Sequence, residues 1–444
     1  MWEFCTIELV YSVILLISSL DIGFTISYPY ASTESLIEDL GITNNECRLF
    51  AGIAYMTAIS GPYICDFVFH YFRRKTTIII FMSINTLLWF ILPSLNKNHF
   101  WIGYIDRAFS GIVLGALTSL VPIYLIEISP KECTGFFGSL FQFAVFFGFV
   151  TCELIGNYLD WKMISYIGGG ICLFFLFMIW FCPDSPLFVS QRFSTVSSVT
   201  LPSNTESSPS PTLSTSETQT NNQDSRPHNS IFYWPYIQKI TYGIILFFFQ
   251  NFTGISIFFN NVPDVFKLTG IIFPDSMAYA VIFIVVVFFC FLGCFFHHSF
   301  GRKIPWIISS AGIFVSLLIQ AIFLKTKMPK WIPFFTHFLY FSFFGISLSS
   351  YPYFALAEIF PSSLRSFAVA VGCSTSWAFT LFNFLLHKPI EELLGQFALL
   401  IIFMCLAFLS CIFGYFFVDK PDLKALDQNS YYGIDDEERT SIDA

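Results

Sequence analysis

The chain has 444 residues, of which 55% are hydrophobic and only 12% are charged. Soluble domains carry about 25% charged residues, so this composition excludes an ordinary soluble fold and indicates a protein embedded in a lipid bilayer. The formal net charge is −8 at pH 7, partly from an acidic C-terminal tail, and no basic surface interleaved with aromatic residues suggests nucleic acid as a partner.

Apolar stretches long enough to cross a bilayer fall into two groups of six. A transmembrane helix needs about 20 mostly apolar residues. We therefore expect an all-α integral membrane protein with 12 transmembrane helices in two pseudo-symmetric halves, at residues 1–182 and 239–418. The expected spans lie at roughly 6–28, 48–70, 76–94, 102–125, 136–157 and 163–182, and then at roughly 240–261, 276–298, 304–324, 332–355, 366–386 and 396–418.

Residues 183–238 interrupt the two groups. Their core, 193–230, is rich in Ser, Thr, Pro and Asn and has almost no large apolar side chains. Such a segment cannot offset its chain entropy by burial, so we expect a partly disordered cytoplasmic linker. A passive tether is the preferred interpretation over a phosphorylated regulatory segment. Residues 419–444 are expected to form an acidic cytoplasmic tail.

The distribution of Lys and Arg predicts the orientation. More basic residues lie on the side that holds both termini and the linker, and this side faces the cytoplasm under the positive-inside rule. We expect a multi-pass protein located in the plasma membrane.

Two charged residues lie inside expected spans. Asp21 is in the first span and Arg107 is in the fourth. Charges inside a membrane are costly, so each calls for a partner or for water. If the helices adjoin, the two could pair, and protonation of Asp21 would release Arg107 and couple proton movement to transport. The alternatives are a purely structural pair, or an Asp21 that contacts water near a helix end.

Uncharged polar side chains gather in the seventh span, where Gln250, Asn251 and Ser256 flank Gly254, and Gln142 lies in the fifth. Amides offer both donors and acceptors without a charge, which suits a ligand covered in hydroxyl groups. Helix–helix contacts are the alternative use of such residues in membranes. Their clustering beside a glycine favours a binding site.

A short repeat occurs at the same place in each half. Residues 127–130 read EISP and residues 358–361 read EIFP, which indicates an internal duplication. Glu127, Glu358 and the nearby Arg365 are expected at the inner ends of spans. There they can form a salt-bridge lock that holds the halves together on the inside.

The cysteines and histidines do not suggest a metal site. Most of the 12 cysteines lie in apolar runs, where small buried side chains are expected. The pair His297 and His298 is expected to be interfacial rather than a metal or pH sensor. We therefore expect no metal, no cofactor and no catalytic residue.

Motifs along nearly the whole chain resemble the sugar porter family of the major facilitator superfamily. The stretch Pro122–Pro130 with Gly135 is similar to P-x-Y-x-x-E-x-x-P-x-x-x-R-G. Further matches are Pro183–Pro186 with P-E-S-P, Gln250–Ser256 with Q-Q-x-x-G-I-N, Gly301–Lys303 with G-R-[RK], Glu358–Pro361 with Arg365 as the end of the tenth helix, and Trp377 with N-W.

The resemblance implies a major facilitator fold, a central cavity, alternating access and a monosaccharide-like substrate, with protons as a further partner. It adds Arg302 to the inner gate, and it places Asp21 near the proton-coupling acid of proton-driven members, with Arg107 as its partner. The substrate-binding positions that it implies are Gln142, Gln250, Asn251, Ser256, Tyr353 and Ser376.

The chain departs from the family pattern at several of these positions. Asn251 stands for a glutamine, Ser256 and Ser376 for asparagines, and Tyr353 for a tryptophan. Each lost hydrogen bond to a ligand costs about 1 kcal/mol, so the substrate need not be glucose. Thr134 replaces the arginine of R-G, from which we expect a weaker inner lock.

Two alternatives to a hexose carrier are open. The first is a non-transporting sugar sensor on a transporter fold, which would fit the altered contacts and the linker. The second is a carrier of a non-glucose polyol or organic solute. A membrane-embedded enzyme is disfavoured, because no HxxxxD-like arrangement or nucleotide loop occurs.

Overall fold

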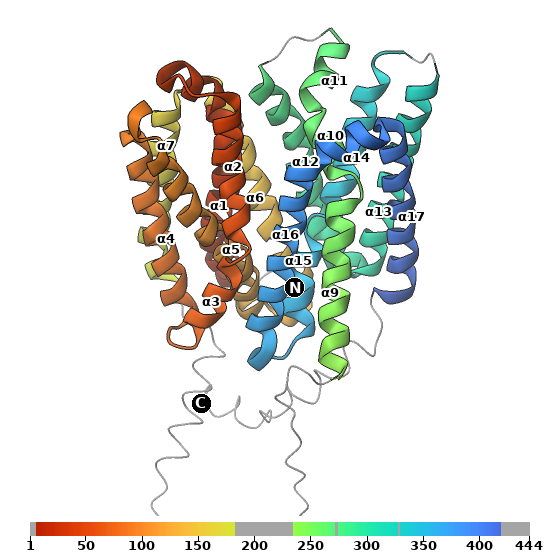
Figure 1. The fold of residues 1–444 in the computed structure, drawn as a ribbon. Coiled ribbons are helices and arrows are strands. Elements are labelled where there is room, and N and C mark those ends of the chain that lie inside the picture. The colour runs from red at the N-terminus through yellow and green to blue at the C-terminus, as the bar shows by residue number, and fades with distance from the viewer. Residues whose placement is uncertain (1–5, 183–233, 271–273, 327–328, 419–444) are drawn as a thin grey trace, which may run out of the picture.

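The computed structural model describes residues 6–182, 234–270, 274–326 and 329–418. Most of the expected linker and the whole acidic tail therefore lie outside the described residues. Within the described ranges every regular element is helical (Figure 1).

The first half of the chain supplies seven α-helices joined by short connections. They are α1 (Thr6–Leu40), α2 (Asn44–Ala58), α3 (Gly61–Phe69), α4 (Arg74–Ile91), α5 (Trp101–Ile128), α6 (Thr134–Gly156) and α7 (Trp161–Met178). The second half supplies α9 (Trp234–Phe252), α10 (Ile255–Asn260), α11 (Val262–Leu268), α12 (Asp275–Phe300), α13 (Lys303–Lys325), α14 (Ile332–Ile346), α15 (Tyr351–Ile359), α16 (Ser362–Leu394) and α17 (Gln396–Phe417).

Eleven helical stretches in the described residues are long and apolar enough to cross a membrane. The remaining expected span, 48–70, is split into α2 and α3. Together these two helices run from the upper to the lower part of the bundle in Figure 1. Pro62 opens α3 and cannot donate a helical hydrogen bond, which accounts for the break. The protein is thus a multi-pass integral membrane protein.

Two helices run further than the sequence predicts. Helix α1 continues through Pro29 to Leu40, although its span was expected to end near residue 28. Contacts at its far end favour this extension, because Asp39 accepts a hydrogen bond from the Trp161 indole at 3.1 Å and pairs with Lys162 at 2.8 Å. Helix α16 likewise continues past residue 386 to Leu394, with Pro389 inside it.

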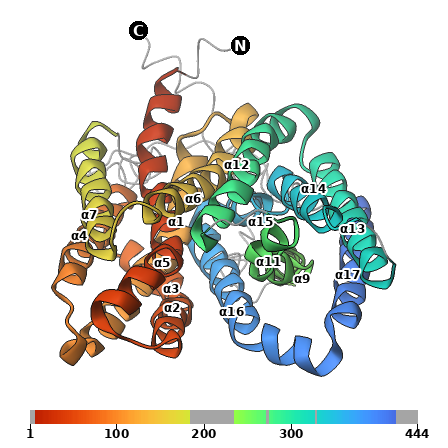
Figure 2. The same cartoon turned by 90° about the horizontal axis from the view of Figure 1, so that it is seen from above.

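Helices α1–α7 and α9–α17 form two groups that lie side by side when the molecule is viewed along its axis (Figure 2). One cluster of buried hydrophobic side chains lies mainly in the first group and another mainly in the second, and each also takes in residues of the other group, such as Trp377 in the first cluster and Phe149 in the second. The groups meet where α6 packs on α12, and where α16 packs on α2, α3 and α5.

Glycines allow helices within each half to approach closely. A Cβ atom on Gly23 of α1 would overlap the backbone of Val145 in α6, and one on Gly148 of α6 would overlap the backbone of Leu20. Small residues at such contacts are typical of packing between membrane helices.

Candidate functional site

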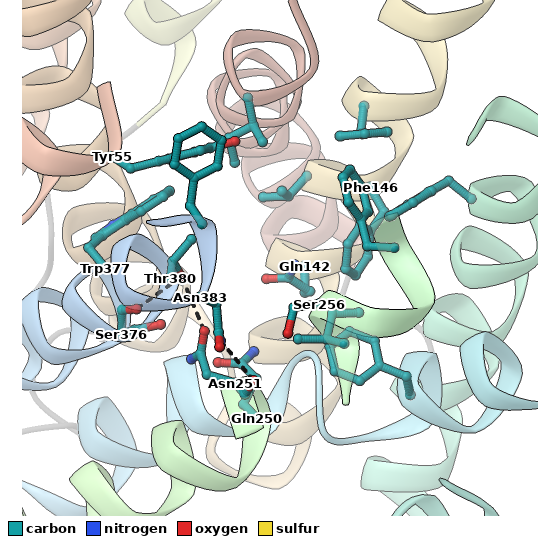
Figure 3. A pocket seen from close by; sticks show the side chains of 18 of the residues that line it. Tyr55, Gln142, Phe146, Gln250, Asn251, Ser256, Ser376, Trp377, Thr380 and Asn383 are labelled. Carbon is teal, nitrogen blue, oxygen red and sulfur yellow. Dashed lines mark hydrogen bonds between the residues drawn. The ribbon is translucent and has the colours of Figure 1, made fainter. Parts of the chain in front are cut away.

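A cavity of about 250 Å³, which we call the central cavity, lies between the two halves (Figure 3). Its walls come from helices of both groups, including α1 and α6 on one side and α9, α10 and α16 on the other. All six substrate-binding positions expected from the sequence line this one cavity: Gln142, Gln250, Asn251, Ser256, Tyr353 and Ser376.

A break between α9 and α10 shapes the cavity. Gly254 has a φ of 104°, a left-handed conformation that glycine adopts without strain. The break ends α9 just after Gln250 and Asn251 and starts α10 with Ser256 in its first turn. Residues from both sides of the break therefore face the same space.

Several polar atoms on the cavity wall form no hydrogen bond with any residue that the structure describes. Gln250 donates to the Ser349 carbonyl at 2.9 Å, but its buried Oε1 accepts no hydrogen bond, and neither does the buried Ser256 hydroxyl. The Gln142 side chain also forms no hydrogen bond with another described residue. A buried polar atom without a hydrogen bond raises the free energy of the folded protein, so these atoms are available to bind a polar ligand.

Asn251 is used differently from the other amides. Its Nδ2 donates to the Phe247 carbonyl at 3.0 Å, and its Oδ1 accepts from the Thr380 hydroxyl at 3.2 Å. Asn383 donates to the Asn251 backbone carbonyl at 3.0 Å. Asn251 therefore joins α9 to α16 and has less capacity left for a ligand than Gln250.

Sequence reasoning missed Thr380 and Asn383, which also line the cavity (Figure 3). They follow Ser376 at helical spacings of four and seven residues, so they share its face of α16. That spacing was the signal that would have found them.

Aromatic side chains form much of the remaining wall. Phe149 stacks on Phe283 with ring centroids 4.4 Å apart, which brings α6 of one half against α12 of the other. Tyr30 of α1 packs edge-on against Phe259 of α10 at 5.5 Å. These rings were not identified from the sequence, because phenylalanine is common throughout the chain.

Tyr353 and Trp377 lie on the wall nearest the other half. Tyr353 packs edge-on against Phe247, with centroids 5.1 Å apart. The Trp377 indole donates to the Thr118 hydroxyl of α5 at 3.0 Å, and its ring stacks with Tyr55 of α2. Trp377 thus joins the two halves at the cavity.

A set of charged side chains closes one end of the bundle, which we call the charged end. Arg365 of α16 lies 3.6 Å from Glu127 of α5, and both side chains are only 2% exposed. Arg74 of α4 reaches the same carboxylate at 3.5 Å. The first pair crosses between the halves, so it opposes their separation at this end.

Arg302 and Glu358 form the second part of the charged end. They pair at 2.6 Å within the C-terminal half. Thr134 of the N-terminal half accepts a hydrogen bond from Arg302 at 2.8 Å and donates one to Glu358 at 3.2 Å. A neutral hydroxyl therefore makes the contact between the halves at the position where the family pattern has an arginine.

Asp21 and Arg107 do not form the direct ion pair that the sequence suggested. Asp21 is buried and accepts hydrogen bonds from Asn85 at 2.6 Å and from the Trp89 indole at 3.0 Å. The closest carboxylate contact of the Arg107 guanidinium is Asp106 at 4.0 Å. Trp89 touches both groups, because the guanidinium carbon also lies 5.7 Å from its ring centre.

A second cavity opens at the end opposite the charged end, which we call the vestibule. Its volume is about 510 Å³, and its walls include Glu34, Glu38 and Asn157. Tyr30 lines both the vestibule and the central cavity, so its side chain lies between them.

Among the described residues, no group of three or more His, Cys, Asp or Glu side chains has the arrangement of a metal site. Cys290 and Cys294 are buried on α12, and the Cys290 thiol lies 3.4 Å from the Ser349 hydroxyl. Of the two histidines expected to be interfacial, His297 is buried against Tyr351 and Phe354, whereas His298 is exposed.

The family model described as "Sugar (and other) transporter" matches residues 9–429. The chain belongs to this family. Among curated members, the facilitated trehalose transporter Tret1 of Bombyx mori is 23% identical over 431 residues, covering 93% of this chain and 84% of that protein. The sugar transporter ERD6-like 6 of Arabidopsis thaliana is 23% identical over 392 residues, covering 83% and 78%.

Solved structures show that this sugar transporter has the major facilitator fold. The proton:xylose symporter XylE with bound 6-bromo-6-deoxy-D-glucose matches with a TM-score of 0.77 at 19% identity, covering 94% of this chain and 98% of XylE. An inward-open structure of XylE from E. coli matches with a TM-score of 0.67 at 19% identity, covering 95% and 99%.

Proposed function

We propose that the protein carries a hexose or a related sugar across the membrane by alternating access. The observation that carries this proposal is that six positions expected from family motifs line one central cavity between the halves. Two of them, Gln250 and Ser256, present buried polar atoms that form no hydrogen bond with any described residue.

The chemistry of the cavity favours an uncharged solute. None of the described residues that line it is charged, and its polar groups are amides and hydroxyls set among aromatic rings. Amides and hydroxyls can donate to and accept from sugar hydroxyls, whereas the rings suit the apolar face of a sugar. The volume of about 250 Å³ lies near the small end of the range for ligand pockets, which favours a monosaccharide over a larger sugar.

Purified protein in proteoliposomes would test the proposal. We expect saturable counterflow of at least one labelled hexose or polyol, competed by unlabelled solute. Folded protein that shows no counterflow with any member of a sugar and polyol panel would contradict it.

We further propose that transport is coupled to protons through Asp21. Three neutral donors, Asn85, Trp89 and the Cys172 thiol, hold this buried carboxyl group, while Arg107 lies against the same Trp89 ring. A proton gained or lost at Asp21 changes the charge beside Arg107 and can change how α1 packs on α5.

The variant Asp21→Asn tests this coupling. It keeps an accepting oxygen for the neighbouring donors but cannot lose a proton. We expect it to abolish uphill accumulation driven by a proton gradient and to spare counterflow. Uphill accumulation that persists in the variant, or a wild type that never responds to a proton gradient, would show that Asp21 does not couple transport.

The orientation and the remaining segments complete the proposal. We place the charged end, both termini and the 183–238 linker in the cytoplasm, and the protein in the plasma membrane. The halves are proposed to span 1–182 and 239–418, followed by a tail at 419–444. Protease protection in sealed vesicles would test this orientation.

A sensor remains the second candidate, favoured by the altered cavity residues such as Tyr353 and Ser376. Deleting residues 193–230 separates the two functions. Unchanged counterflow would assign the segment a tethering role in a carrier, whereas binding without any counterflow in the intact protein would favour a sensor.

A further inference from the structure

Glu153 is a buried carboxyl group that the proposed transport path does not use. It lies on α6, is 0% exposed and accepts a hydrogen bond from the Ser27 hydroxyl of α1 at 2.7 Å through Oε1. Its Oε2 has no hydrogen-bond partner, and Glu153 forms no ion pair with any described residue.

Its position on α6 lies between the two cavities. Phe149, one turn before it, lines the central cavity, and Asn157, one turn after it, lines the vestibule. Residues four apart share one face of a helix, so Glu153 sits on the face that passes from one cavity to the other. The helix that supplies Ser27 also supplies Tyr30, whose side chain separates the cavities.

The groups around Glu153 are neutral or acidic. Tyr30 on α1 and Tyr279 on α12 interact with it electrostatically, and the Cys152 thiol precedes it on its own helix. Glu34 and Glu38 line the vestibule beyond, as does Asp275, which pairs with Lys267 at 3.3 Å. No described cation compensates a charge on Glu153.

The ionised form of a carboxyl group in such a site has a large desolvation cost, and only the Ser27 hydroxyl among the described residues offsets it. The protonated, neutral form is therefore favoured. The neutral acid needs no counter-charge and places its proton on Oε2. The acidic groups of the vestibule raise the local concentration of cations, including protons, at the nearest water.

We propose that the Glu153 carboxyl is a proton-binding site between the central cavity and the vestibule, protonated while the vestibule end is closed and ionised when that end opens. On opening, water from the vestibule reaches the carboxyl. The Oε2–H bond then breaks, its electron pair stays on oxygen, and water or a buffer base takes the proton. Before Glu153 is buried again, its carboxylate takes a proton back from hydronium or from the protonated buffer in the vestibule. The site is distinct from Asp21, which lies beside Asn85 and Trp89.

Infrared difference spectroscopy on the purified full-length protein tests the protonation state without any transport. Subtracting the spectrum of Glu153→Gln from that of the wild type at neutral pH should reveal the loss of a protonated-carboxyl C=O band. The exposed Glu46, which accepts hydrogen bonds from the Thr43 backbone and hydroxyl, is the matched control. Its change Glu46→Gln should remove carboxylate bands instead. Loss of carboxylate bands in Glu153→Gln would overturn the proposal.

Ser27→Ala provides a second measurement that keeps the glutamate. It removes the hydrogen bond to Oε1, so the C=O band of the neutral acid should shift to higher frequency. If Glu153→Gln fails to fold, this shift alone decides, and a protonated-carboxyl region that does not change in Ser27→Ala would overturn the proposal.

The role of opening rests on the proposed transport function and has its own measurement. In proteoliposomes, the dependence of the KM for counterflow on vestibule-side pH should be weaker in Glu153→Gln, where Asp21 still contributes, than in the wild type, and unchanged in Glu46→Gln. A pH dependence unchanged by Glu153→Gln would overturn the gating role. Absence of any counterflow would count against the transport proposal and leave the spectroscopic result standing.

Discussion

The amides of the cavity wall differ in how much of their hydrogen-bonding capacity the protein itself consumes. Asn251 uses both ends of its side chain, one on the Phe247 carbonyl of its own helix and one on Thr380 of α16. Gln142, in contrast, forms no hydrogen bond with a described residue, and the Oε1 of Gln250 accepts none from the described residues. A solute should therefore gain more from Gln142 and Gln250 than from Asn251, although all three line the same space.

Gln142→Leu tests this difference at the level of one residue. The variant removes the amide and nearly keeps the volume, so we expect the KM for counterflow to rise about fivefold, from the loss of about 1 kcal/mol of hydrogen bonding. Gln320→Leu is the matched control, because Gln320 is buried away from the cavity and accepts from the Thr336 hydroxyl at 2.6 Å. It should lower stability and leave the KM unchanged; equal effects on KM would argue against direct contact by Gln142.

The sequence predicted these residues through local motifs and could not rank them. Gln250 and Asn251 are adjacent and chemically alike. Only the packing of α16 shows that Thr380 donates to the Asn251 side chain and that Asn383 donates to its backbone carbonyl. The direct pairing expected between Asp21 and Arg107 failed for a similar reason. Trp89 and Asn85, which hold Asp21, carry no signal that links them to it along the chain.

At the scale of the helices, hydrophobic length predicted the spans well and their ends poorly. The break between α2 and α3 follows from Pro62, which a search for apolar runs does not weigh. The extension of α1 to Leu40 is accompanied by tertiary contacts of Asp39 with Trp161 and Lys162, which no local pattern encodes.

The close approach of α1 and α6 depends on the absence of a side chain at Gly23. A methyl group there would overlap the Val145 carbonyl of α6, so Gly23→Ala should push the helices apart and destabilise the protein by about 1–3 kcal/mol. Thermal unfolding in detergent measures this loss. Gly170→Ala is the control, because a methyl group at Gly170 of α7 meets no atom within 4 Å. Equal unfolding temperatures for the two variants would refute the packing argument.

At the scale of the whole molecule, the charged end and the vestibule end are closed by different kinds of contact. Ion pairs and the Thr134 hydroxyl join the halves at the charged end. At the vestibule end the contacts between halves are mainly aromatic, such as Tyr30 with Phe259, with one hydrogen bond from Ser276 to Asn157 at 2.9 Å. The internal repeat predicted the two halves, but which end is closed depends on these contacts between halves.

Arg365→Ala should bias the molecule towards opening at the charged end. The variant removes a buried charged contact to Glu127, which we expect to shift the equilibrium by about 2 kcal/mol. Alkylation of the half-buried Cys133, followed by peptide mass spectrometry, should be faster than in the wild type. Lys162→Ala, which breaks an exposed pair with Asp39 at the other end, should leave the rate unchanged. Slower or unchanged alkylation in Arg365→Ala would contradict the gate.

Glu127 is shared by two arginines that belong to different halves, and this makes separation at the charged end unequal in its cost. When α16 moves away from α5, Glu127 keeps Arg74, its partner within the N-terminal half. Arg365 gives up its contact with Glu127 across the halves, and the Phe360 carbonyl of its own half, to which its Nε donates at 3.3 Å, moves with it. Opening at this end therefore breaks the link between the halves without leaving the carboxylate alone, which lowers the electrostatic cost of the movement.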